Sequence, residues 1–126
     1  MPDLVGEWQG KAQEDFSVAA GLLRRRKVPA DIVCFHCQQA VEKWLKALSQ
    51  RDGIRFSKVH SLVALAAPLH PAYPQLELMG DDLRRLTLYA VIFRYPGSHA
   101  TKEDAKKAVA AARRVRTAIL GIMQRK

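Results

Sequence analysis

The chain has 126 residues, of which 48% are hydrophobic, and it carries a formal net charge of +9 with a pI of about 10.0. This composition excludes an intrinsically disordered chain, and no apolar run approaches the roughly 20 residues that a bilayer-spanning helix needs. We therefore expect one soluble, cytoplasmic domain over residues 1–126, with no membrane contact. The excess of Lys and Arg favours a polyanionic partner such as RNA or a nucleotide, although a basic surface can also serve solubility alone.

Residues 4–26 are predicted to form the first helix. Apolar side chains recur there at steps of three and four residues, which places them on one helix face: Val5, Trp8, Ala12, Phe16, Ala19 and Leu23. The segment ends in the basic run 24–27, which complements the negative end of a helix dipole. Pro29 then marks a break in the chain.

Residues 31–51 are predicted to form the second helix. Its apolar face is expected to contain Ile32, Phe35, Ala40, Val41, Trp44, Leu45 and Leu48. Glu42 and Lys46 have the spacing of an ion pair between successive helical turns. Gln38 and Gln39 stand among apolar neighbours, so they need hydrogen-bond partners if they are buried.

Two cysteines, Cys34 and Cys37, fall within this second helix. There is no second cysteine pair that would complete a zinc site. We expect a reduced, structural pair, with a redox or metal-binding role as the alternative. The sequence predicts no metal site and no cofactor.

The middle of the chain is predicted to hold a short helix and then a longer one. The short helix covers residues 60–69, and the loop that follows cannot be a continuous helix because it contains Pro68, Pro71 and Pro74. Residues 81–94 return to helix and are apolar on nearly every side, and a helix with that pattern is expected to be buried on every side. In a small bundle this implies a second partner surface, so we predict a homodimer interface here.

The last helix is predicted over residues 102–123. Pro96 and Gly97 break the chain before it, and Thr101 with Asp104 resembles a capping box. One regular stripe of small and branched apolar residues follows: Ala105, Ala108, Val109, Ala112, Val115, Ile119 and Ile122. The predicted fold is therefore all-α, an antiparallel up-and-down bundle of four long helices plus a short helix.

Several stretches resemble one family. The run from Cys34 to Ala47 contains the order Gln-Gln-Ala-x-Glu-Lys followed by Lys-Ala, which is similar to the signature of HEPN domains (higher eukaryotes and prokaryotes nucleotide-binding). The spaced residues Trp8, Ala12 and Asp15 match the family's first helix. The resemblance continues through Lys58-Val59-His60-Ser61-Leu62, Arg94-Tyr95-Pro96-Gly97 and Glu103-Asp104-Ala105, and it covers essentially the whole chain.

This resemblance implies a helical bundle that commonly dimerises and pairs with a minimal nucleotidyltransferase in a toxin–antitoxin system. It also implies metal-independent endoribonuclease activity, because many HEPN proteins cleave RNA with an Arg followed by four to six residues and a His. Arg94 and His99 have that spacing here.

The chemistry of this pair suits RNA cleavage. A histidine side chain titrates near neutral pH, so His99 could accept the proton of a ribose 2′-hydroxyl or protonate a leaving oxygen. Arg94 keeps its charge and could stabilise the pentavalent transition state through paired hydrogen bonds. Two copies across a dimer would supply the acid and the base together.

Two departures keep a non-catalytic alternative open. Tyr95 follows the arginine where ribonuclease members usually have a polar residue, and Thr101 stands where nucleotide-modified toxins often have a tyrosine. The alternative is a module that binds a nucleotide, RNA or its protein partner without chemistry, or a purely structural role for the pair. In the binding versions, Tyr95 could stack on a base, and Lys106 and Arg113 could contact phosphates.

Overall fold

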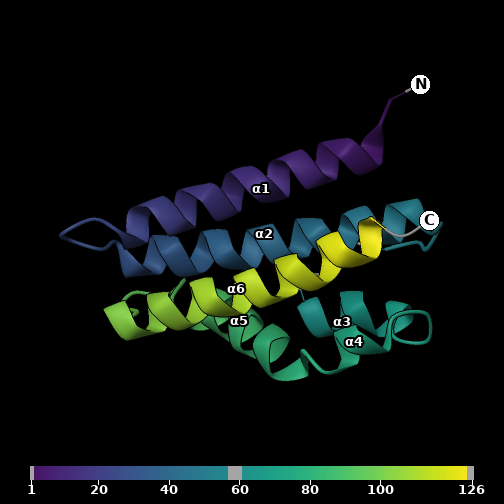
Figure 1. Cartoon of the computed structure of the whole chain (residues 1–126). Coiled ribbons are helices and arrows are strands. Elements are labelled where there is room, and N and C mark those ends of the chain that lie inside the picture. Colours follow the sequence, from purple (N-terminus) through teal and green to yellow (C-terminus); the bar gives the residue numbers. More distant parts are fainter. Residues whose placement is uncertain (1, 57–60, 125–126) are drawn as a thin grey trace.

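A computed structural model of the chain describes residues 2–56 and 61–124. Within these ranges all regular structure is helical, and no strand is present. The elements are α1 (Leu4–Leu23), α2 (Ala30–Arg51), α3 (Leu62–Ala66), the 3-10 turn η1 (Ala67–Leu69), α4 (Pro74–Glu77), α5 (Gly80–Ile92) and α6 (Lys102–Met123) (Figure 1). The predicted all-α bundle of long and short helices is therefore confirmed.

Helix α2 is the centre of the bundle. It packs extensively against α1 along one side and against α6 on the other, and it also contacts α5 and α3. Helices α1 and α5 run in one direction and α2 and α6 in the opposite one, so the end of α1 lies beside the starts of α2 and α6 (Figure 1). No helix within the described residues combines the length and the apolar character needed to cross a membrane.

The core forms where the apolar faces of α1, α2 and α6 meet. Trp44 of α2 is buried and packs at a tilt against Phe16 of α1, with ring centroids 5.7 Å apart. Helix α6 contributes the regular stripe expected from the sequence, and Val115 and Ile119 are fully buried. Each such side chain stabilises the fold by about 1.5–3 kcal/mol when it leaves water, so these faces dominate the packing.

The helix limits agree closely with the sequence for α2 and α6 and less well elsewhere. α6 covers the predicted residues, and the Thr101–Asp104 capping box is present. α1 ends at Leu23, three residues before the predicted end. α3 and η1 occupy most of the predicted 60–69 helix, and one turn of helix, α4, begins at Pro74 within the predicted loop. His60 and Lys58, which carry part of the family resemblance, lie outside the described residues.

The first turn of α2 corrects one prediction. Ile32 and Phe35 were expected on the buried face, but 50% and 47% of their surfaces are exposed. Val33 and Cys34 occupy the buried positions of that turn instead. The two residues therefore lie outside the arc of α2 that α1 and α6 cover.

Helix α5 also differs from its prediction. Only Leu83 and Leu86 are buried, whereas Leu88, Val91 and Ile92 are exposed. The helix is thus not buried on every side within this chain. Its exposed residues Leu88, Val91 and Ile92 follow helical spacing and form one uncovered stripe, and Tyr95 beyond the end of the helix is exposed as well.

Polar and sulfur side chains inside α2 have structural roles. Lys46 lies 3.2 Å from Glu42 in the expected ion pair. Gln38 is buried, donates to Glu42 and accepts a hydrogen bond from Gln39. Cys34 and Cys37 are free and buried, and burial raises the pKa of the Cys34 thiol to about 12. A thiol with that pKa stays protonated and is a poor nucleophile or metal ligand, which supports the structural interpretation of the pair.

Candidate functional site

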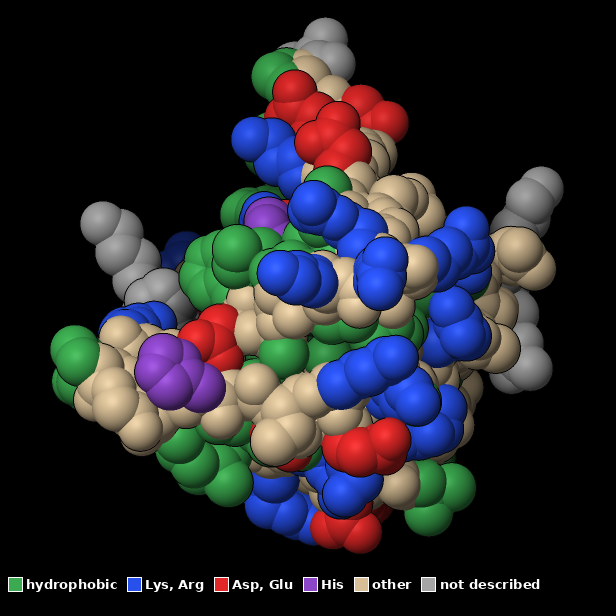
Figure 2. All heavy atoms as spheres, turned by 90° about the vertical axis from the view of Figure 1, so that its left-hand side faces the viewer, with side chains coloured by type: hydrophobic (Ala, Val, Ile, Leu, Met, Phe, Trp, Pro, Cys, Tyr) green, Lys and Arg blue, Asp and Glu red, His purple; other side chains and the backbone are tan. Residues whose placement is uncertain are grey.

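Basic residues gather at one end of the bundle, which we call the basic end. It is made by the 24–29 loop, the start of α2, the 93–101 connection and the start of α6. Its exposed cationic residues are Arg24, Arg25, Arg26, Lys27, Arg94, Lys102, Lys106 and Lys107. Figure 2 looks onto this end and shows a broad cluster of Lys and Arg side chains across its middle, with hydrophobic side chains between them. Such a surface attracts a polyanion.

A tight turn reverses the chain between α5 and α6. The Ser98 N–H donates to the Tyr95 carbonyl at 3.2 Å, and Gly97 has a φ of +90°. Proline at the second position and a positive φ at the third are characteristic of a type II turn, so Pro96 and Gly97 suit their places. The turn puts Arg94 before the reversal and His99 after it. The two residues are therefore not on one continuous helix.

His99 is held by Asp31, the second residue of α2. The His99 Nδ1 lies 3.3 Å from one carboxylate oxygen of Asp31, and the backbone N–H of Ala100 donates to the other oxygen. An ionised carboxylate only accepts hydrogen bonds, so this contact favours the proton on Nδ1 and leaves Nε2 able to accept one. The His99 side chain is 77% exposed and is accessible to a large substrate.

Arg94 lies beside the same carboxylate. Asp31 and Arg94 both line a hollow of about 160 Å³ between α2 and α5, whose other walls are Phe35, Tyr89, Ala90 and Phe93. Arg94 is exposed just beyond the last turn of α5. The fold thus brings both residues of the predicted motif near Asp31, His99 by a direct contact and Arg94 through the shared hollow.

The other predicted binding residues are distributed more widely. Tyr95 is 62% exposed at the start of the turn. Lys106 is exposed on α6 and pairs with Glu103 at 3.5 Å. Arg113 lies further along α6, with its guanidinium 5.6 Å from the centre of the Phe16 ring. None of the three lines the hollow beside Asp31.

Comparison with known proteins agrees with this architecture. The family model of the HEPN domain matches residues 5–122. The chain belongs to the HEPN family. No curated protein matches it.

Two solved structures share the fold of this HEPN chain. One is the crystal structure of TT1696 from Thermus thermophilus, with a TM-score of 0.82 and 22% sequence identity over 95% of this chain and 98% of that one. The other is ST0689, described as an archaeal HEPN homologue, with a TM-score of 0.68 and 24% identity over 93% of this chain and 95% of that one. At these identities the likeness shows the fold.

Hydrogen bonds anchor the start of α6 beside the hollow. Asp104 accepts from the backbone N–H of Thr101, which is the main reason that its pKa lies below the ordinary value. The Tyr89 hydroxyl donates to Asp104 at 3.1 Å, and burial is the main reason that the pKa of this phenol is raised. These contacts tie α5 to α6 and keep one wall of the hollow in place.

Signature positions of this HEPN chain form a second polar cluster between α1 and α2. Asp15 accepts from Lys43 and lies 2.8 Å from the Nδ1 of His36, and all three side chains are mostly buried. His36 is thus a packed helix residue with an inter-helical hydrogen bond. The cluster joins the two helices that support the basic end.

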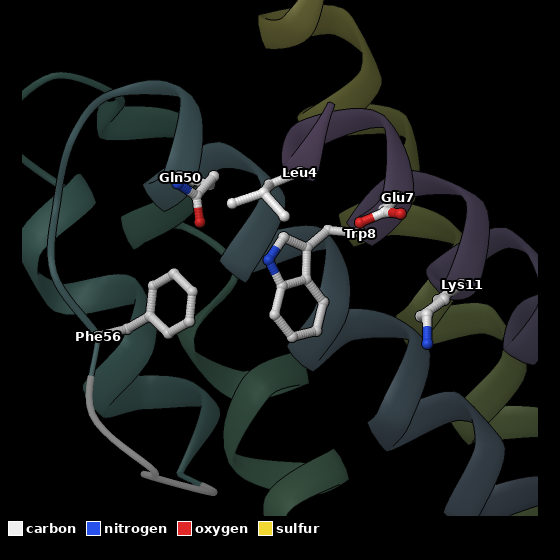
Figure 3. Close-up of a pocket in the computed structure, with 6 residues that line it drawn as sticks. All are labelled: Leu4, Glu7, Trp8, Lys11, Gln50 and Phe56. Atoms are coloured by element: carbon white, nitrogen blue, oxygen red, sulfur yellow. The ribbon is translucent and has the colours of Figure 1, made fainter. Parts of the chain in front are cut away.

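A different hollow lies at the opposite end of the bundle, which we call the aromatic end. It measures about 320 Å³ and is lined by Leu4, Glu7, Trp8, Lys11, Gln50 and Phe56 (Figure 3). The Trp8 and Phe56 rings meet edge to face with centroids 6.0 Å apart. Lys46 lies 5.4 Å from the Trp8 ring and 5.7 Å from the Phe56 ring, so a cation already covers this pair.

Sequence reasoning missed two residues of the site. Asp31 resembles an ordinary acidic residue in the first turn of a helix, which stabilises the helix dipole without any further role. Phe35 fits the apolar face of the helix by its spacing. An acid that directly follows a helix start and an aromatic residue one turn later are the available signals, and neither is specific.

Proposed function

We propose that this HEPN protein is a metal-independent endoribonuclease that acts as a homodimer. The observation that carries the proposal is the contact between Asp31 and His99 beside the Arg94-lined hollow, within a basic surface. A histidine with a free Nε2 and an adjacent guanidinium are the groups that cleavage of a phosphodiester by its own 2′-hydroxyl requires.

Each residue has a defined role in this reaction. The Nε2 of His99 takes the proton of the ribose 2′-hydroxyl, the 2′-oxygen bonds to phosphorus, and the bond to the 5′-oxygen breaks. Arg94 stabilises the negative charge that develops on the phosphoryl oxygens. The leaving 5′-oxygen takes a proton from the imidazolium of a second copy. Asp31 is a positioning residue that fixes the imidazole tautomer.

The uncovered stripe of α5 supports the dimer. Leu88, Val91, Ile92 and Tyr95 lead directly to Arg94, so a second copy packed on them would bring two sites together. Val91→Glu should yield a monomer in light scattering without unfolding the chain, because Val91 is 53% exposed. Val18→Glu is the matched control, since Val18 is 43% exposed on α1. A parent protein that is monomeric at micromolar concentration would remove the dimer from the proposal.

The decisive experiment is RNA cleavage in EDTA. The parent should cut a single-stranded RNA, and His99→Ala should lower the rate about 100- to 10,000-fold, the usual contribution of a general base. Asp31→Asn should also slow cleavage and alter its pH profile, because the amide can hold either tautomer. Equal cleavage by the parent and His99→Ala, or no cleavage by either, would contradict the catalytic proposal.

We further propose that the protein is the toxin of a pair and is silenced by a minimal nucleotidyltransferase. The family relationship supports this partner. Modification at Thr101 is disfavoured, because its hydroxyl accepts from the Asp104 N–H as the helix cap. Silencing would therefore come from covering the basic end. Co-expression with the partner should relieve growth arrest, and this relief should survive Thr101→Asn, which keeps a capping acceptor but has no hydroxyl to modify.

A second candidate function is binding of nucleotide, RNA or the partner without cleavage. The Pro96–Gly97 turn favours it, since it separates Arg94 from His99 along the chain. In that case RNA or nucleotide should bind to the basic end with equal affinity in the parent and in His99→Ala. Arg94→Ala should weaken binding, and calorimetry would detect this loss.

A further inference from the structure

The hollow beside Asp31 has the lining of a base-binding site. Phe35 of α2 forms one wall, packs edge to face against the ring of His36 and remains 47% exposed. Tyr89 of α5 and Phe93, the residue that caps its C-terminus, form the other side, with ring centroids 5.2 Å apart. Arg94 closes one edge. A flat apolar ligand with an adjoining negative charge matches these groups.

The size and position of the hollow narrow the choice of ligand. About 160 Å³ has room for one planar ring system and not for a base pair. Arg94 and the nearby exposed run 24–27 would attract the phosphates on either side of that ring. Unpaired RNA bases characteristically stack on aromatic side chains while basic residues follow the backbone.

We propose that this hollow binds one unpaired base of single-stranded RNA, next to the phosphate that Arg94 contacts, with Phe35 as the stacking residue. The inference rests on the site of the proposed function but not on its chemistry. Both carboxylate oxygens of Asp31 already contact His99 and Ala100, so we do not expect them to distinguish one base from another. Recognition should therefore tolerate any base.

The test measures binding of a fluorescent single-stranded RNA 12-mer to His99→Ala, which keeps the RNA intact. Adding Phe35→Ala should weaken binding roughly tenfold or more, as expected when one stacking platform is removed. Ile32→Ala is the matched control, because Ile32 is equally exposed on the same turn but does not line the hollow, and it should leave affinity unchanged. A blunt RNA duplex of the same sequence should bind both variants alike.

Three results would overturn the base site. They are unchanged affinity in Phe35→Ala, an equal loss in Ile32→Ala, and a fall in molar mass in Phe35→Ala that places the ring in the dimer interface. The proposed catalysis fails separately. If the parent cuts no RNA but Phe35-dependent binding persists, the base site stands and cleavage is wrong. If the parent cuts RNA and Phe35→Ala binds RNA normally, cleavage stands and the base site is wrong.

Discussion

The two ends of the bundle are built from the same helices but differ in the contacts that their cationic side chains make. At the aromatic end, Lys46 pairs with Glu42 and covers two rings, and Arg51 contacts Asp52 and Tyr73. At the basic end, none of the four cations at positions 24–27 pairs with another described residue. Charges that are already paired contribute to packing, whereas unpaired charges on one surface are available to a polyanion. Under our proposal, RNA contacts the basic end, and the paired cations of the aromatic end have structural roles.

The largest expected effect comes from reversing charges at the basic end. Arg25→Glu with Arg26→Glu should lower RNA affinity on the order of 10- to 100-fold at low salt, and should reduce the slope of log affinity against log salt by roughly 0.7 per lost contact. Fluorescence anisotropy across a salt series measures both quantities.

The matched control for this change lies at the other end. Lys11→Glu with Arg55→Glu alters the net charge by the same amount, and both residues are exposed near the aromatic end. If this control lowered RNA affinity as much as the loop variant, attraction would come from net charge alone, and the contrast between the ends would be lost.

A smaller effect, on stability, is expected at the aromatic end. Trp8→Ala removes the edge-to-face contact with Phe56 and the Lys46 contact, and should lower the free energy of unfolding by about 1–3 kcal/mol. RNA affinity should not change. Chemical denaturation provides the measurement, with Leu78→Ala as a control at a side chain that is 87% exposed. Weakened RNA binding by folded Trp8→Ala would mean that this end also contacts RNA.

The smallest effect concerns the cap that supports the hollow. The pKa of Asp104 is lowered in the fold from its ordinary value of 3.8, so its stabilisation is present at neutral pH and is lost as the pH falls below 3.8. Asp104→Asn should cost about 0.5–1 kcal/mol at pH 7, the usual contribution of a helix cap. Thermal unfolding of the two proteins should converge in acid. A constant difference at all pH values would show that charge is not involved.

Local patterns predicted the fold well where a helix is long and regular. The α6 stripe and the Thr101–Asp104 cap are short-range features, so the limits of this helix could be found from the sequence. The turns η1 and α4 could not, because three prolines indicate only a loop there. Ile32 and Phe35 fit an apolar helix face as well as Val33 and Cys37 do. Periodicity alone therefore could not predict which side of the first turn of α2 is buried.

The candidate site was predictable only in part. Arg94 and His99 are close in sequence and carry a recognisable spacing. Asp31 lies 68 positions from His99, and their contact depends on α2 starting at the same end as α6. Such a contact leaves no periodic signal. The hollow could not be predicted for the same reason, because its walls come from α2 and from the distant α5 segment.

The most direct test of this account is an amide chemical-shift titration of the ¹⁵N-labelled His99→Ala protein with a single-stranded RNA 12-mer. It compares both ends of the bundle in one measurement. If RNA binds at the basic end, the largest shift changes occur at residues 24–35 and 93–107. Changes centred on residues 4–11 and 50–56, or none at either end, would contradict this account.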